Sequence, residues 1–97
     1  MKSRMGDCYR IAANNVIDNK YLLLCHGIVS GQGKLKGKRI GHAWNELQDM
    51  VFDFSNGRQI IIRKEKYYRI GKIKKVKKYT RDEAIKLMLI YKSLGPW

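Results

Sequence analysis

Three residues of this 97-residue chain, Cys8, His42 and Asp53, could together carry thiol chemistry. In such a site a cysteine thiolate attacks a carbonyl carbon, a histidine transfers the proton, and a carboxylate orients the histidine ring. Each residue also has a structural interpretation. Cys8 could pack as a small helix residue, His42 could stabilise a hairpin, and Asp53 could bind the backbone amides of the next turn. The elements that position the three residues decide between these interpretations.

Residues 7–18 are predicted to form a helix, because apolar residues recur there at the spacing of one helical face. The apolar residues of this face are Tyr9, Ala12, Ala13 and Val16. Asp7 is a suitable N-cap residue, which places Cys8 in the first turn. At that position the helix dipole and the free backbone N–H groups favour a thiolate over a thiol, and the N–H of Cys8 itself could bind an oxyanion.

Residues 40–54 are predicted to form a β-hairpin that carries both His42 and Asp53. Side chains alternate between the two faces of a strand. A two-residue turn at residues 48–49 therefore places His42 diagonal to Asp53 on the same face, within reach of a cross-strand contact. We expect the two side chains to pair, because an unpaired histidine or aspartate on an apolar face is costly.

The two faces of this hairpin differ in character. The face of His42 and Asp53 also carries Ile40, Trp44 and Val51. The other face looks more like a core face and carries Ala43, Leu47, Met50, Phe52 and Phe54. The first helix could pack on either face. Packing on the face of His42 would indicate a thiol enzyme, and packing on the other face would indicate a hairpin whose histidine is only structural.

The rest of the chain predicts further strands and a C-terminal helix. Residues 21–29 form an apolar strand that should be interior, residues 30–39 a basic glycine-rich loop, and residues 58–63 a strand after a turn at residues 55–57. In residues 64–78, Tyr67, Tyr68 and Ile70 could lie on a short helix, and the residues around Ile73 and Val76 on a strand or in a loop.

Thr80 and Glu83 form the capping box of the last helix. Gly95 and Pro96 are expected to end this helix. Its buried stripe should consist of Ala84, Leu87, Met88 and Tyr91. The chain is thus predicted to be a single α+β domain over residues 1–97, with an N-terminal helix packed on a small antiparallel sheet and a helix at the C-terminus.

The charge of the chain is strongly positive, with 21 lysines and arginines against 8 acidic residues and a net charge of +13. This balance favours an anionic partner, either nucleic acid, an anionic membrane surface or an acidic protein, although a solvated lysine-rich surface explains it equally well. We find no secretory signal and no apolar run long enough to cross a membrane, and only two cysteines, so we expect a cytoplasmic protein without a transmembrane segment.

The order of cysteine at a helix start, histidine on a strand and aspartate on the next strand resembles the papain-like superfamily. The similarity is strongest to its transglutaminase-like and small amidase or deamidase branches, and rests on residues 7–9, 41–44 and 51–53. It implies a minimal papain-like core in which Cys8 is the nucleophile, His42 the base and Asp53 the orienting group. It further implies acyl transfer from a peptide, a protein side-chain amide or a small amide or ester.

Two more residues could complete such a site. Trp44 could wall the cleft, although a plain sheet aromatic explains it as well, and Asn56 could help to bind the oxyanion. The spacing of the cysteines and histidines does not match a zinc site, so we expect neither a metal nor a cofactor.

The alternative function is a non-enzymatic basic module that binds nucleic acid or an acidic protein partner. Tyr67 or Tyr68 would then stack on bases. The basic face would consist of Lys34, Lys36, Lys38, Lys64, Lys66, Lys74, Lys75, Lys77 and Lys78. A third possibility is a degenerate member of the fold that keeps the scaffold for protein contacts.

Overall fold

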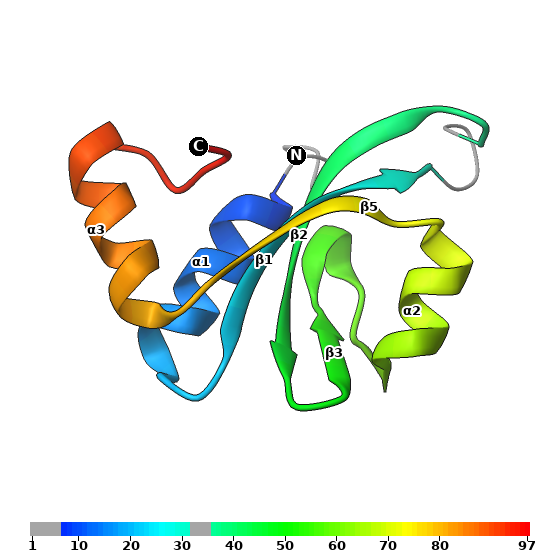
Figure 1. Cartoon of the computed structure of the whole chain (residues 1–97), viewed down its shortest axis with the longest axis horizontal. Coiled ribbons are helices and arrows are strands. Elements are labelled where there is room, and N and C mark those ends of the chain that lie inside the picture. The colour runs from blue at the N-terminus through cyan, green and yellow to red at the C-terminus, as the bar shows by residue number, and fades with distance from the viewer. Residues whose placement is uncertain (1–6, 32–35) are drawn as a thin grey trace.

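The structure is a computed structural model that describes residues 7–31 and 36–97, apart from the side chain of Asn56. It is an α+β fold in which helices flank a five-stranded sheet (Figure 1), which confirms the predicted fold class. The elements in chain order are α1 (Cys8–Asp18), β1 (Leu23–Ser30), β2 (Arg39–Leu47), β3 (Met50–Asp53), the 3-10 turn η2 (Ser55–Gly57), β4 (Ile60–Arg63), α2 (Lys64–Gly71), β5 (Lys74–Tyr79) and α3 (Arg81–Tyr91).

The sheet is antiparallel throughout, with the strand order β4-β3-β2-β1-β5. β1 lies in the interior of the sheet, as its apolar sequence predicted. Leu47 pairs with Met50, which confirms the two-residue turn between β2 and β3. Gln48 in this turn adopts a left-handed backbone with φ of 54°. The predicted register of the hairpin is therefore present.

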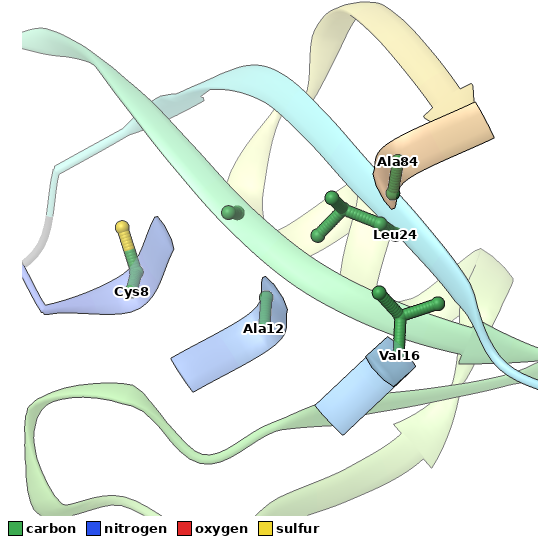
Figure 2. Packing of buried hydrophobic residues seen from close by; sticks show 6 residues of the cluster. Cys8, Ala12, Val16, Leu24 and Ala84 are labelled. Atoms are coloured by element: carbon green, nitrogen blue, oxygen red, sulfur yellow. The ribbon is translucent and has the colours of Figure 1, made fainter. Parts of the chain in front are cut away.

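Helices cover both faces of the sheet and divide the core in two. On one face α1 and α3 pack against β1 and β2, and Ala12, Val16 and Leu24 are buried there (Figure 2). On the other face α2 packs over Trp44 and Val51. The small side chains of α1 allow this helix to approach the sheet closely.

The expectation that the face of Phe52 and Phe54 is more core-like than the face of His42 was wrong. Trp44 and Val51, on the face of His42, are 1% and 0% exposed. Leu47 is 36% exposed, and Phe52 and Phe54 are only half-buried. The reason is α2, whose tyrosines cover the face of Trp44 and whose position the hairpin sequence cannot reveal.

The segment over residues 64–78 forms a short helix and then a strand, one of the two alternatives left open by the sequence. β5 pairs with β1 and forms one edge of the sheet. Residues 32–35 of the predicted basic loop lie outside the described residues. Among the residues described, none of the helices has the length and apolar character needed to cross a membrane.

The last helix confirms its predicted start but not its predicted end. The Thr80 hydroxyl accepts a hydrogen bond from the Glu83 N–H, and the Glu83 carboxylate accepts one from the Thr80 N–H. The helix ends at Tyr91, before Gly95, because Lys92 adopts the left-handed backbone that stops it.

The predicted buried stripe of α3 is also partly wrong. Ala84 is buried and Leu87 and Met88 are half-buried, but Tyr91 is 60% exposed. Only the first turns of α3 lie against the core formed with α1, so the last turn has no surface to cover it.

Candidate active site

Cys8 is the first residue of α1 and its side chain is buried, with only 5% exposed. Asp7 occupies the N-cap position as predicted, but its side chain makes no capping hydrogen bond. Its carboxylate instead lies 3.9 Å from the Arg10 guanidinium. Cys8 therefore stands where the sequence placed it, at the positive end of an 11-residue helix.

His42 and Asp53 form a buried pair between β2 and β3. The distance from His42 Nε2 to Asp53 Oδ2 is 2.9 Å. The His42 residue is 9% exposed and the Asp53 residue 2%. The contact is the diagonal one that the two-residue turn predicted.

The Cys8 thiol lies beside His42, since it is one of the groups that raise the pKa of the imidazole. Because Nε2 of the imidazole is engaged by Asp53, the remaining ring nitrogen, Nδ1, is the one available to the thiol. The structure thus brings together all three residues that the sequence proposed, from α1, β2 and β3. Cys8 and His42 lie 34 positions apart in the chain.

α1 packs on the face of the sheet opposite to α2, so Cys8 reaches His42 from that face. α1 lies on the face of Ala43, so the thiol approaches from the side that was expected to exclude a catalytic site. The ladder between β2 and β3, however, stops at the Asn45–Phe52 pair. Beyond this pair the two strands, α1 and η2 border a shallow hollow, which we call the cleft and which has no room for a water molecule. Its lining includes Cys8, Trp44, Phe54, Asp53 and Ser55.

Asp53 accepts hydrogen bonds on both carboxylate oxygens. Oδ1 accepts from the Ser55 N–H at 3.1 Å and from the Ser55 hydroxyl at 2.7 Å. Oδ2 accepts from the Tyr67 hydroxyl at 2.6 Å in addition to its contact with His42. Burial by itself raises the pKa of Asp53, but these hydrogen bonds and the charge of His42 outweigh it and hold the pKa well below its usual range. Asp53 is therefore ionised at neutral pH.

His42 is cationic at neutral pH for a related reason. Burial lowers its pKa, but the hydrogen bonds with Asp53 and Cys8 and the charges of both groups raise the pKa to about 9. A thiol beside an imidazole is the arrangement of a thiol nucleophile and its base. The imidazolium can also donate a proton to a departing amine or alcohol.

Trp44 lies beside the imidazole but is part of the core. The two ring centroids are 6.1 Å apart with an interplanar angle of 23°. The indole N–H of Trp44 donates to Glu46 at 2.9 Å and so points away from the cleft. Trp44 is one of the lining residues of the cleft, and its ring stacks beside His42. The side chain of Asn56, proposed for the oxyanion, lies outside the described residues.

Sequence reasoning missed a buried polar cluster around Glu46, whose side chain is completely buried. Its carboxylate accepts hydrogen bonds from Trp44 and Tyr68 and lies 2.9 Å from Lys78 Nζ and 3.5 Å from Lys64 Nζ. The signal that could have found it is the strand period, because Glu46 follows His42 and Trp44 on the same face. No local sequence pattern indicated that Tyr67 would bind Asp53, which lies 14 positions away in the chain.

These contacts change the interpretation of the proposed basic face. Tyr67 and Tyr68 direct their hydroxyls inward to Asp53 and Glu46, so they do not offer free rings for stacking. Lys64 and Lys78 are paired with Glu46. Lys34 lies outside the described residues. The remaining members are all exposed: Lys36, Lys38, Lys66, Lys74, Lys75 and Lys77.

The other cysteine and histidine are separated by the sheet, as the strand period predicted. Cys25 is completely buried on the α2 side, and burial and the nearby Glu46 carboxylate raise the pKa of its thiol. His26 lies on the opposite face, among Tyr9, Tyr79 and Trp97. In the described part of the chain, no three histidine, cysteine or acidic side chains are grouped as metal ligands would be.

Comparisons of this chain with protein-family models, with curated proteins and with solved structures find no match. The similarity to papain-like proteins therefore stays a prediction from short motifs, and the functional argument depends on the geometry of the site.

Proposed function

We propose that this protein is a small papain-like cysteine hydrolase or acyltransferase that acts on an amide or ester bond. The observation that carries the proposal is the buried hydrogen bond between His42 and Asp53 with the Cys8 thiol beside the same imidazole. Three elements that are distant in sequence supply these groups. A structural cysteine, histidine and aspartate have no need to meet in this order at a helix N-terminus.

The mechanism follows from the charges of the three groups. The Cys8 thiolate attacks the carbonyl carbon and forms a carbon–sulfur bond, and the carbonyl oxygen becomes an oxyanion near the free N–H groups of the first turn of α1. The His42 imidazolium donates its proton to the leaving amine or alcohol as the carbon–nitrogen or carbon–oxygen bond breaks. Neutral His42 then accepts a proton from water or an amine, which takes the acyl group. Asp53 stays ionised and keeps the imidazole in place.

Thiol alkylation tests the proposal, with Cys25 as an internal control. Iodoacetamide should label Cys8 of the folded protein at pH 7, and mass spectrometry of peptides should find Cys25 unlabelled. His42→Ala should slow the labelling of Cys8 about tenfold or more, because the neighbouring imidazolium that favours the thiolate is lost. The proposal fails if only Cys25 reacts or if neither thiol reacts.

Turnover is the second part of this test. The folded protein should hydrolyse an activated acyl ester or transfer its acyl group to an added amine, and Cys8→Ser and Cys8→Ala should both abolish the reaction. The Cys25→Ala variant is the matched control and should retain the activity.

The exposed lysines of α2 and β5 favour a second candidate function, the binding of an anionic partner. Single- and double-stranded nucleic acid should be titrated at two salt concentrations with both the wild-type protein and Cys8→Ala. Submicromolar binding that weakens steeply with salt and survives the Cys8 substitution would favour this function. Absence of binding to both nucleic acids even at the lower salt concentration would exclude nucleic acid as this partner.

A further inference from the structure

We propose that Tyr67 is a positioning residue of the Cys8–His42–Asp53 site, which it serves by binding the carboxylate oxygen that also holds His42. This inference rests on the proposed function and adds to it a residue from a fourth element, α2. Tyr67 touches no reacting atom in this proposal, because it acts through Asp53.

The geometry around Asp53 Oδ2 carries the argument. This oxygen lies 2.6 Å from the Tyr67 hydroxyl and 2.9 Å from His42 Nε2. The other oxygen, Oδ1, accepts two hydrogen bonds from Ser55. A carboxylate held on both oxygens by β2, η2 and α2 cannot rotate without breaking a buried hydrogen bond, which costs about 1–3 kcal/mol.

Tyr67 is itself held in place by the core. Its ring lies 5.5 Å from the ring of Trp44, centroid to centroid, and that indole stacks beside His42. Burial and the charge of Asp53 raise the pKa of Tyr67 far above neutral, with Cys8 adding to the rise and Arg58 opposing it. The hydroxyl is therefore a constant hydrogen-bond donor, and the groups facing His42 that titrate or carry charge are Asp53 and Cys8.

The shared oxygen gives Tyr67 a specific effect on the histidine. A donor that binds Oδ2 withdraws part of the negative charge that stabilises the imidazolium. Removal of the Tyr67 hydroxyl should therefore raise the pKa of His42 and, at the same time, loosen the orientation of its ring. A purely structural tyrosine would change protein stability but would not shift the titration of His42.

The test compares Tyr67→Phe with Tyr68→Phe in the full chain. The two tyrosines are neighbours on α2, and each donates its hydroxyl to a buried carboxylate, but Tyr68 binds Glu46 and not Asp53. NMR titration of the His42 imidazole should give a pKa about half a pH unit higher in Tyr67→Phe than in the wild type. Tyr68→Phe should leave it unchanged. The rate of Cys8 alkylation at pH 7 should fall several-fold in Tyr67→Phe only.

Two outcomes would overturn the inference: a His42 titration that Tyr67→Phe leaves unchanged, or an equal shift in both variants. Should Tyr67→Phe not fold, Tyr67→Met carries the same test, because it also removes the hydroxyl from Asp53 Oδ2 while filling apolar space, and it should also raise the pKa of His42. The NMR titration needs no catalytic turnover. It therefore separates failure of this inference from failure of the proposed function, which the alkylation of Cys8 and the acyl-transfer assay decide.

Discussion

At the scale of single residues, Asp53 determines the state of the candidate site. It is a nearly inaccessible carboxylate with hydrogen-bond donors on both oxygens, and its charge keeps His42 cationic. Cys25 shows the opposite case, a thiol kept neutral by burial beside the carboxylate of Glu46. The same chain thus holds one cysteine beside a cation and one beside an anion, which is why we expect their reactivities to differ.

Replacement of Asp53 tests this role directly. Asp53→Ala should lower the pKa of His42 below its ordinary value of 6.5, because burial then acts without the opposing carboxylate. Breaking this buried pair should also destabilise the fold by about 3 kcal/mol. Urea unfolding at pH 7 measures the stability, and NMR titration measures the pKa. Asp49→Ala, which removes an exposed carboxylate paired with Arg63, is the control and should change neither quantity appreciably.

The stability of the protein should fall on the alkaline side because of His42. Its pKa is about 9 in the folded protein and 6.5 when unperturbed, so the folded state binds the proton more tightly. The resulting stabilisation is complete below pH 6.5 and is lost as the pH rises through 9. Urea midpoints from pH 6 to pH 10 should show this loss, and His42→Gln should flatten that part of the curve. A wild-type midpoint that stays constant from pH 6 to pH 10 would contradict a raised pKa of His42 in the folded protein.

At the scale of secondary-structure elements, α2 decides how the site is closed. It follows β4 and precedes β5 in the chain (Figure 1). Two of its tyrosines cover the face of Trp44. Glu46 joins this helix to the sheet, because its carboxylate binds Tyr68 and Lys64 of α2 and Lys78 of β5. A second buried acid, Glu46, therefore anchors the helix that supplies Tyr67, because it binds Tyr68, the next residue of that helix.

Substitution of Glu46 should loosen this anchor. Glu46→Ala leaves the Trp44 indole and the Tyr68 hydroxyl without their buried acceptor, and should cost about 2–4 kcal/mol in the free energy of unfolding. Glu46→Gln keeps an acceptor oxygen and loses only the pairing with two partly exposed lysines, so it should cost clearly less. Urea unfolding of the two variants compares these values. Equal losses would show that charge, and not hydrogen bonding, anchors α2.

At the scale of the whole molecule, the end of the chain folds back over the α1 face of the sheet. The Trp97 ring lies 5.1 Å from the His26 ring, and a Cβ at Gly95 would lie only 2.7 Å from His26 Cε1. Tyr9, which follows Cys8, and Tyr79 of β5 contact the same imidazole. One neutral histidine thus joins α1, β1, β5 and the C-terminal residues.

This cluster should make the protein sensitive to acid. Burial and the charge of Lys77 lower the pKa of His26 to about 4, against 6.5 when it is unperturbed. The unfolded chain therefore binds the proton first, and stability should fall by roughly 2–3 kcal/mol as the pH drops from 6.5 to 4. Thermal or urea unfolding between pH 4 and pH 7 measures this fall. His26→Gln should remove this part of the slope even if it lowers stability at pH 7.

Much of the fold could be predicted from the sequence because the signals are local. The helical period of residues 7–18, the capping box at Thr80 and the strand period of the hairpin each involve residues a few positions apart. The contact between His42 and Asp53 belongs to this group, since a two-residue turn and the alternation of side chains are enough to predict it.

Only the tertiary structure decided the rest, because those contacts depend on where distant segments pack and where a ladder ends. The meeting of Cys8 with His42 requires α1 on one face and the end of the ladder between β2 and β3 at Asn45. The bond from Tyr67 to Asp53 requires α2 on the other face. The sequence by itself determined a histidine–aspartate pair on a hairpin. The packing of two helices on opposite faces of the sheet determined which thiol and which hydroxyl that pair meets.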